Sequence, residues 1–361
     1  MRVFGRNIKH VEFGWNSWRG KSCCIRMAGS TNIAKKAITL EDVQNAAKRI
    51  GPFINHTPVM TSSTLNTMAG RSLFFKCENF QKVGAFKFRG AMNAVMKLTE
   101  DNPEGDLPAV VTHSSGNHAQ ALALAAKIKG LRAHIVMPNN APAVKKAAVK
   151  DYGARIIECG ISQQNREEAA KNTLEETGPN SCLIPPYDHV DIIAGQGTMA
   201  LELLEQVPDL DAIVVPVGGG GMLSGICVAA KGLKPGIKIF AAEPLEANDC
   251  AKSFAAGERI PLPGPPVTVA DGLKTSLGFL TWPIIRDSIE DVITVTENEI
   301  ISAMRLVWER MKLVIEPSAA VGVAAVLNEK FCSDKTNGVT KAGIILCGGN
   351  VNLDNLPWNT K

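Results

Sequence analysis

The pattern of apolar and polar positions in residues 107–185 predicts strands that alternate with helices. Short apolar runs at 110–111, 135–137 and 155–158 have the length and composition of buried strands. Helical stretches at 117–129, 143–152 and 164–176 separate these runs. Such alternation indicates βαβ units, which form a parallel sheet with right-handed crossovers. We therefore expect residues 107–185 to form a small, compact α/β lobe.

The same alternation continues on both sides of this region. Thr39 and Asp42 form a possible capping box for a helix that ends near Gly51-Pro52. A proline-rich loop is expected at residues 259–266. The further strands are expected at 73–76, 212–217, 237–242 and 343–346, and the further helices at 91–98, 195–206, 222–231, 300–313 and 319–327. We expect residues 31–106 and 186–361 to form together a larger lobe.

Composition fits two such lobes. The chain has 361 residues, of which 45% are apolar and 20% charged, as in ordinary globular proteins. No apolar run reaches the roughly 18 residues needed to cross a bilayer. The net charge of +4 is concentrated in residues 1–30, so the remainder is nearly neutral. We therefore expect neither a membrane nor a nucleic-acid partner.

Residues 1–30 are basic and lack an apolar signal-peptide core. They resemble an organelle presequence, which would be mitochondrial, and a disordered extension or a segment absent from the mature protein fits as well. The nine cysteines are scattered without a CxxC pair. This spacing indicates neither a disulfide framework nor a zinc site, and reduced thiols favour a cytoplasmic location.

The first candidate for chemistry is Lys87, which lies between Phe86 and Phe88 with glycines at 84 and 90. A lysine among aromatic residues needs a reason to be buried. A desolvated amine attacks aldehydes well, and a Schiff base with pyridoxal phosphate is the usual use of such a lysine. The alternative is that Lys87 only extends along the surface to water.

Two further stretches follow strands and begin helices. Ser114-Ser115-Gly116-Asn117-His118 offers backbone N–H groups and hydroxyls to a carboxylate, although simple helix capping would need the same residues. Residues 218–222, Gly-Gly-Gly-Gly-Met, allow backbone N–H groups to surround a phosphate. They match neither the dinucleotide fingerprint nor a P-loop. A merely flexible loop is the alternative.

The last predicted strand ends at Cys347-Gly348-Gly349-Asn350. A neutral thiol there could contact a pyridine nitrogen as a weak partner. A core cysteine is the simpler interpretation.

Taken in this order, these stretches resemble the fold-type II pyridoxal phosphate enzymes, in the branch of the serine racemases and the serine/threonine dehydratases. The resemblance covers residues 39–356 and includes Ala270-Asp271-Gly272 and Ile315-Glu316-Pro317. It implies a tryptophan synthase β-like α/β fold with two lobes, the smaller of them (residues 107–185) mobile, and mostly parallel sheets. It also implies a homodimer with pyridoxal 5'-phosphate between the lobes.

The resemblance further implies roles for individual residues. Lys87 would bind the cofactor and act as the base on one face of the substrate, and Ser115 would exchange the proton on the other face. The implied cofactor-binding residues are Phe86, Lys87, Asn117, Tyr187, Gly218, Gly219, Gly220, Gly221, Met222, Glu316 and Cys347. The implied substrate-binding residues are Ser114, Ser115, Gly116, Asn117, His118, Arg166 and Thr275.

Two regulatory sites are implied as well. Glu243, Ala247 and Asp249 match a divalent-cation site with oxygen ligands, suited to Mg²⁺, Ca²⁺ or Mn²⁺, and a solvated acidic loop is the alternative. An allosteric ATP pocket is implied by Ser62, Ser63, Thr64, Lys82, Gln120, Tyr152, Lys312 and Asn350.

The implied activity is interconversion of L- and D-serine, with β-elimination of serine to pyruvate and ammonia as a second reaction and threonine as a possible substrate. An L-serine/L-threonine ammonia-lyase without significant racemisation is the alternative, and Ser115 speaks against it. A non-catalytic relative is a third possibility, which the retained Lys87 disfavours. Two positions depart from vertebrate racemases: Cys347, where many have serine, and the loop 185–188, Pro-Pro-Tyr-Asp.

Overall fold

The computed structural model describes residues 38–102, 109–332 and 334–359. The predictions about residues 1–30 lie outside these ranges. Residues 38–361 form one compact unit. In the described part of the chain, no helix is long and apolar enough to cross a membrane.

A six-stranded sheet forms the centre of the larger hydrophobic core, in the order β1-β2-β10-β7-β8-β9. Its strands are β1 (Val59–Met60), β2 (Ser72–Lys76), β7 (Ala212–Pro216), β8 (Lys238–Pro244), β9 (Asp291–Val295) and β10 (Lys341–Ile345). β1 pairs antiparallel with β2, and every other pairing in this sheet is parallel. β10 lies between β2 and β7 in the sheet, although it follows both of them by more than 100 residues in the sequence.

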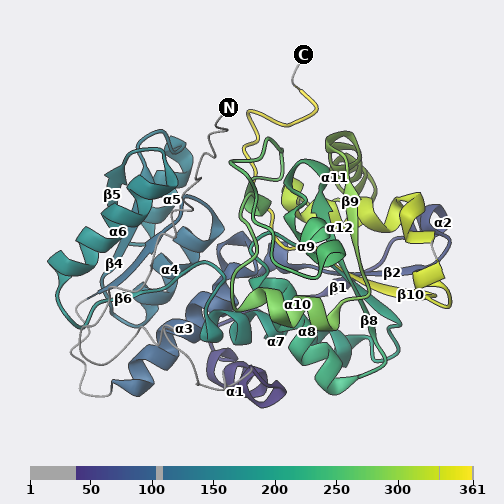
Figure 1. Ribbon diagram of the computed structural model, residues 1–361, viewed down its shortest axis with the longest axis horizontal. Coiled ribbons are helices and arrows are strands. Elements are labelled where there is room, and N and C mark those ends of the chain that lie inside the picture. The colour runs from purple at the N-terminus through teal and green to yellow at the C-terminus, as the bar shows by residue number, and fades with distance from the viewer. Residues whose placement is uncertain (1–37, 103–108, 333, 360–361) are drawn as a thin grey trace, which may run out of the picture. The chain divides into compact units, whose positions relative to one another are not determined.

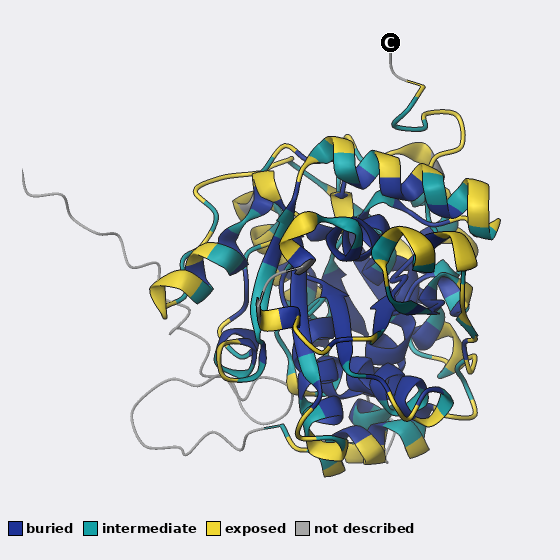
Figure 2. Cartoon of the chain, turned by 90° about the vertical axis from the view of Figure 1, so that its right-hand side faces the viewer, coloured by how far each residue is buried: buried dark blue, intermediate teal, exposed yellow. Residues whose placement is uncertain are grey.

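Helices cover this sheet, with their apolar sides turned inward (Figures 1 and 2). They are α1 (Leu40–Ile50), α2 (Ser63–Ala69), α3 (Lys87–Asp101), α7 (Val190–Gln206), α8 (Gly221–Leu233), α9 (Asp249–Ala256), α10 (Thr281–Ser288), α11 (Glu297–Met311) and α12 (Pro317–Leu327). α7 packs on both α3 and α8, while α12 lies on β7 and β8. The predicted capping box of α1 is confirmed, since Thr39 and Asp42 satisfy each other's backbone N–H groups.

A separate four-stranded parallel sheet has the order β5-β4-β3-β6. Its strands are β3 (Val110–His113), β4 (Ala133–Pro138), β5 (Arg155–Cys159) and β6 (Cys182–Leu183). The helices between them are α4 (Asn117–Ile128), α5 (Ala143–Asp151) and α6 (Gln163–Thr177). The predicted alternation is confirmed here, while the boundaries of the predicted lobes stay a prediction.

Short 3-10 helices complete the described chain. They are η1 (Glu78–Phe80), η2 (Lys82–Gly84), η3 (Leu245–Ala247), η4 (Asp271–Leu273), η5 (Glu329–Cys332) and η6 (Asp334–Thr336).

Two helices begin at least four residues earlier than predicted. α3 begins at Lys87 itself, four residues before the predicted start, and α7 begins at Val190, five residues early. The prediction that Gly195 starts a helix is wrong, because glycine, which usually marks a helix boundary, lies here inside the helix. A Cβ at Gly195 would come within 2.7 Å of the Gly90 Cα atom. This glycine therefore serves close helix packing.

Candidate active site

Lys87 is the first residue of α3 and is partly buried. Its Nζ donates a hydrogen bond to the Pro186 carbonyl oxygen at 2.6 Å. Burial lowers the pKa of Lys87 to about 8, and attraction to the Glu316 carboxylate opposes that shift only in part. A neutral, nucleophilic amine is therefore accessible close to neutral pH, as Schiff-base chemistry requires.

The turn before Lys87 is fixed to the segment that follows β10. Gly349 N donates to the Gly84 carbonyl oxygen at 2.9 Å, and Phe86 N donates to the Cys347 carbonyl oxygen at 3.0 Å. Gly84 has a φ of +68°, a backbone conformation that would be strained in a residue with a side chain. These contacts bring the thiol of Cys347 into electrostatic range of Lys87, although 260 residues separate them in the sequence.

Cys347 is fully enclosed, and its thiol stays neutral. Burial, together with the nearby carboxyl of Glu316, raises the pKa of this thiol well above its ordinary value. A neutral S–H is a weak hydrogen-bond donor and acceptor. Its chemistry therefore fits the expected weak contact with a pyridine nitrogen.

The four glycines form the connection from β7 to α8. Gly220 has a φ of +89°, and α8 begins at Gly221. A Cβ at Gly221 would lie 2.9 Å from the Tyr187 Cα atom, and a Cβ at Gly219 would collide with the Tyr187 ring. The first N–H groups of a helix have no partner within it, and they attract anions. The glycines leave the backbone of this loop without side chains, so its N–H groups are free to surround a phosphate.

Two residues that the sequence reasoning missed fix this loop from outside. Thr281 Oγ1 donates to the Gly219 carbonyl oxygen at 2.9 Å. The Asp188 carboxylate accepts hydrogen bonds from the backbone N–H groups of Phe279 and Leu280, at 3.0 and 2.8 Å. The sequence showed an aspartate next to Tyr187. It could not show the partners of this aspartate, because every residue type except proline has a backbone N–H group.

The turn of residues 114–118 connects β3 to α4. Gly116 N donates to Ser114 Oγ at 3.3 Å, and Ser115 remains partly accessible. His118 is buried and donates from Nε2 to the Ile184 carbonyl oxygen at 2.9 Å. Burial, followed by repulsion from Lys87, lowers the pKa of His118 to about 3. The imidazole is therefore neutral near Lys87, and its Nδ1 has no hydrogen-bond partner among the described residues.

Asn117, Glu316 and Asn350 form a connected polar group. Asn117 Nδ2 donates to both carboxylate oxygens of Glu316, at 3.0 and 3.1 Å. Asn350 Nδ2 donates to Asn117 Oδ1 at 2.9 Å, and Asn350 N donates to Glu316 Oε2 at 3.1 Å. Burial, reinforced by Asp271, raises the pKa of Glu316 to about 7. Asn350, expected in the nucleotide pocket, thus contacts a predicted cofactor residue directly.

The two remaining substrate candidates differ. Thr275 forms a side-chain hydrogen bond with Tyr187, whose pKa is raised chiefly by burial. Arg166 lies on α6, where its Nε donates to the Ser162 carbonyl oxygen at 3.4 Å. No hydrogen bond between described residues joins Arg166 to the turn at 114–118, so its predicted role has no support from these contacts.

The predicted cation site contains two buried carboxylates. Glu243 accepts backbone hydrogen bonds from Cys250 and Ala251 at the start of α9, and Asp249 accepts one from Leu277. Burial raises the pKa of Glu243 to about 8 and that of Asp249 to about 6. Ala247 lies in η3 between them. Two buried acids near each other fit a cation, but the described residues contain no cluster of three or more such ligands.

The other nucleotide candidates are spread over several elements. Ser62 caps α2, whose first turn contains Ser63 and Thr64. Lys82 lies in η2, and Lys312 follows α11 with a φ of +59°. Gln120 lies on α4 and Tyr152 follows α5. Their places on separate elements do not by themselves test the ATP site, which stays a prediction.

Comparison with known proteins identifies the family. Residues 50–348 match the model described as pyridoxal-phosphate dependent enzyme. Human serine racemase is 53% identical over 326 residues, which cover 90% of this chain and 95% of the human protein. The structure of maize serine racemase aligns with a TM-score of 0.85 and 50% identity, covering 88% of this chain and 95% of the maize chain.

A threonine deaminase from T.th. aligns less closely. Its structure gives a TM-score of 0.80 at 39% identity and covers 87% of this chain and 99% of the deaminase. The predicted fold class, mostly parallel α/β sheets of the fold-type II architecture, is confirmed by these matches. The chain belongs to the pyridoxal-phosphate dependent enzymes and, among them, to the serine racemase family.

Proposed function

We propose that this chain interconverts L- and D-serine with pyridoxal 5'-phosphate, and that it also eliminates water from serine, giving pyruvate and ammonia. The observation that carries the proposal is the amine of Lys87, held at a pKa of about 8 and close enough to His118, in the turn that contains Ser115, to lower the pKa of that histidine. Serine racemases at 50 to 53% identity support the choice of reaction.

The residues around Lys87 are suited to hold the cofactor. The N–H groups of residues 218–222 would bind its phosphate, and Asn117 would hydrogen-bond its ring hydroxyl. Phe86 would pack on the ring, and Cys347 would meet the pyridine nitrogen without protonating it. When bound, pyridoxal phosphate supplies an electron sink that makes the Cα proton of an amino acid acidic.

Racemisation needs a proton-transfer group on each face of Cα. With a pKa of about 8, Lys87 accepts a proton easily and returns it at neutral pH. Ser115 would supply the group on the opposite face. His118 stays neutral, so it would act as a hydrogen-bond acceptor rather than as a charged ligand.

The substrate's carboxylate would bind the N–H groups and hydroxyls of residues 114–118, at the positive end of α4. Thr275 would contact the substrate from the opposite side of the site, beside Tyr187. Threonine differs from serine by one methyl group, which a pocket of this kind excludes only weakly. We therefore include threonine as a possible substrate.

Regulation and assembly complete the proposal. Mg²⁺, Ca²⁺ or Mn²⁺ would bind Glu243, Asp249 and the carbonyl group of Ala247, neutralising two buried acids. ATP would activate the enzyme at the interface of a homodimer, and the enzyme would act in the cytoplasm.

Cys347 supports a second candidate, an L-serine/L-threonine ammonia-lyase with little racemisation. Cysteine at this position is typical of serine dehydratases, as the resemblance implies. The discriminating feature is Ser115, because elimination requires no group on the second face.

The test is to incubate the purified protein with L-serine, Mg²⁺ and ATP, and to measure D-serine by chiral chromatography and pyruvate in the same samples. Formation of both products supports the proposal. Pyruvate without D-serine would establish the ammonia-lyase instead. The Lys87→Ala variant serves as the control and should form neither product.

A further inference from the structure

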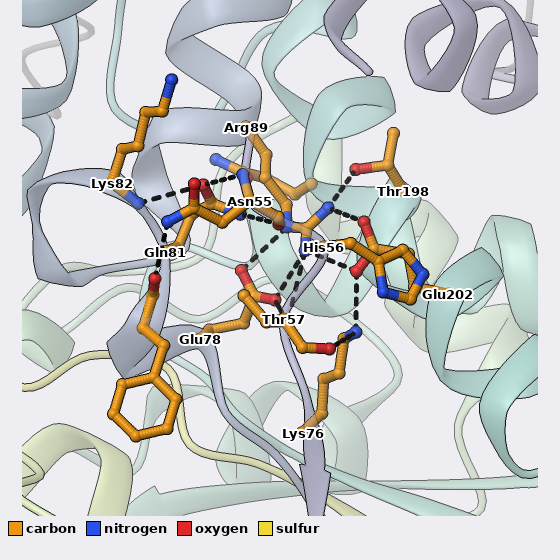
Figure 3. Close-up of polar contacts among 12 residues, drawn as sticks. Asn55, His56, Thr57, Lys76, Glu78, Gln81, Lys82, Arg89, Thr198 and Glu202 are labelled. Atoms are coloured by element: carbon orange, nitrogen blue, oxygen red, sulfur yellow. Dashed lines mark hydrogen bonds and ion pairs between the residues drawn. The ribbon is translucent and has the colours of Figure 1, made fainter. Parts of the chain in front are cut away.

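A buried group of charged residues surrounds Arg89, two positions after Lys87 in α3. This ion cluster consists of Lys76 at the end of β2, Glu78 in η1, Arg89 in α3 and Glu202 in α7 (Figure 3). The side chains of the first three are 0% exposed and that of Glu202 is 12% exposed. Two cations and two carboxylates therefore share one enclosed site, and none of them contributes to the proposed chemistry.

Arg89 uses its whole guanidinium group in this cluster. Nε and Nη2 donate to the two carboxylate oxygens of Glu78, each at 2.8 Å. Nη1 and Nη2 donate to the two oxygens of Glu202, at 2.6 and 2.9 Å. A further bond from Nη1 reaches Thr198 Oγ1 at 3.3 Å. Each of two edges of the guanidinium binds one carboxylate, and this fixes both the position and the plane of the Arg89 side chain.

Lys76 fastens the cluster to the six-stranded sheet. Its Nζ donates to Glu202 Oε2 at 2.7 Å, to Gln206 Oε1 at 2.9 Å and to the Thr57 carbonyl oxygen at 2.8 Å. Burial by itself would raise the pKa of Glu202, but hydrogen bonds from Arg89 hold this pKa below its ordinary value. The Glu202 carboxylate is thus ionised near neutral pH.

The helices α3 and α7 approach closely beside the cluster. A Cβ at Gly195 would lie 2.8 Å from the Arg89 carbonyl oxygen, and Gly90 N donates to Gln196 Oε1 at 3.1 Å. One turn further along α3, Asn93 Nδ2 donates to the Asp191 carbonyl oxygen at 2.7 Å. Contact residues nearer the C-terminus of α3 therefore meet residues nearer the N-terminus of α7. The two helices cross in opposite directions with their backbones nearly touching.

This crossing sets the position of Lys87 relative to its partner. Lys87 begins α3, and Pro186, whose carbonyl oxygen accepts the Lys87 amine, lies four residues before the start of α7. A slip of α3 by one residue would move the amine by about 1.5 Å along the helix axis. An error of about 1 Å in a reacting group can cost about 100-fold in rate. Glycine surfaces alone do not prevent such a slip. The hydrogen bonds of Gly90 and Asn93 to α7 oppose it, and so does the Arg89 guanidinium, which two carboxylates hold.

We propose that Arg89 is a positioning residue, which fixes the register of α3 against α7 through Glu78 and Glu202 and thereby holds the Lys87 amine in its reactive place. Well-packed apolar residues would stabilise a core at least as well as buried charges do. The cluster therefore serves to fix the position of α3 relative to α7 rather than to add stability. The inference rests on the proposed function of Lys87.

The test compares two variants in the full chain. Arg89→Lys keeps the charge and loses the planar fork that reaches both carboxylates. The control is Phe331→Leu. The Phe331 ring packs on the Phe240 ring, with 5.3 Å between their centroids, and neither residue belongs to α3, α7 or the ion cluster. This variant therefore loses stability without changing the cluster. For each protein we would measure melting temperature, kcat and KM for serine, and the fraction of Lys87 bound to cofactor, trapped by borohydride and mapped by mass spectrometry.

For Arg89→Lys we expect kcat for both products to fall on the order of 10- to 100-fold, with KM within about 3-fold of the original value. The trapped fraction at Lys87 should fall too, while Phe331→Leu keeps both values. Unchanged kcat and trapping in a folded Arg89→Lys protein would overturn the inference. If that variant does not fold, Thr198→Val, which removes one bond to Arg89, should lower kcat and trapping in the same direction, and its failure to do so would overturn the inference equally.

The two proposals fail separately. Absence of cofactor at Lys87 in the unaltered protein would contradict the proposed function. Normal trapping there, together with an Arg89→Lys protein that behaves like the original, would contradict only the role of Arg89.

Discussion

At the scale of single residues, the site combines groups whose surroundings change their protonation. Lys87 has a pKa of about 8 and Glu316 one of about 7, and His118 stays neutral. Burial is the first cause in all three. The result is an environment in which protons can move near neutral pH without a permanently charged histidine beside the amine.

The pKa of Lys87 gives the first prediction. Only the neutral amine attacks an aldehyde, and in the folded chain the neutral form becomes the majority above pH 8 instead of above 10.5, the ordinary value for lysine. The rate of pyridoxal phosphate attachment to the cofactor-free protein should therefore rise with pH and reach half its maximum near 8. Stopped-flow absorbance at 410–420 nm, roughly the band of a protonated lysine Schiff base, measures this rate.

The Lys87→Ala variant is the control for that experiment, because it should lack the phase centred near pH 8. A midpoint close to the ordinary lysine value in the unaltered protein would show that Lys87 is not desolvated.

A second prediction concerns Ser115. Ser115→Ala removes the proposed proton-transfer group on one face and leaves Lys87 on the other. Racemisation should fall by about 10²- to 10⁴-fold, the usual range for one acid–base group. Some elimination of L-serine should remain. Chiral chromatography and a pyruvate assay on the same samples measure both, and unchanged racemisation would contradict the two-face assignment.

Sequence reasoning located Lys87, Gly218–Gly221, Asn117 and Cys347, because each depends on residue type within a short motif. The structure places Lys87 near Cys347 and joins Asn117 to Glu316, while the roles of all these residues toward the cofactor stay predictions. Pro186 could not be found in this way, since it contributes only a carbonyl oxygen. Arg89 escaped notice for another reason: its partners Glu78 and Glu202 stand 11 and 113 residues away.

At the scale of elements, the connection between β7 and α8 is the most constrained part of the site. Gly219 and Gly221 face Tyr187, while Gly220 adopts a left-handed conformation. The loop therefore excludes side chains on more than one ground, steric and conformational. Other turns accept side chains more freely: a Cβ at Gly116 or Gly236 meets nothing within 4 Å.

This contrast gives a third prediction. Gly219→Ala forces the Tyr187 ring or the loop to move, at a cost of about 1–3 kcal/mol, and the cofactor's affinity should fall by about 10- to 100-fold. Gly236→Ala is the matched control and should bind as the original does. Equilibrium dialysis with pyridoxal phosphate measures both affinities. Equal affinities in the two variants would show that the loop does not bind the phosphate.

The helix starts show where pattern reasoning fails at this scale. Glycine at position 195 predicts a boundary, while the structure uses it as a packing surface against Gly90. Both uses arise from the missing Cβ, and only the partner helix decides between them. The sequence reasoning also missed α9, α10 and β9, which have only 8, 8 and 5 residues and so repeat their patterns few times.

At the scale of the whole molecule, alternation of strands and helices predicted parallel sheets, and this is confirmed. It did not give the strand order, because the sequence carries no direct signal of which parallel strands are neighbours. β1 illustrates the point: two residues long, it pairs antiparallel at the edge of the six-stranded sheet. β6, equally short, was missed in the other sheet.

A fourth prediction follows from the buried acids Glu243 and Asp249. A divalent cation that binds only the folded chain stabilises it by about 2.7 kcal/mol at roughly 100 times its Kd. Mg²⁺ should therefore raise the melting temperature, and EDTA should reverse the rise. Asp249→Asn should remove the dependence on Mg²⁺, while Glu290→Gln, at a partly exposed ion pair with Lys231, should retain it. An equal rise in Asp249→Asn would place the ion elsewhere.

The position of β10 between β2 and β7 has a consequence for synthesis on the ribosome. Until residues 341–345 have emerged, β2 and β7 lack a common neighbour, and the six-stranded sheet is divided in two. Unpaired strand edges and apolar surface persist during that delay, a condition that favours aggregation. A nascent chain of this protein would therefore depend on chaperones until β10 has emerged, and Cys347 would join Lys87 only after that step.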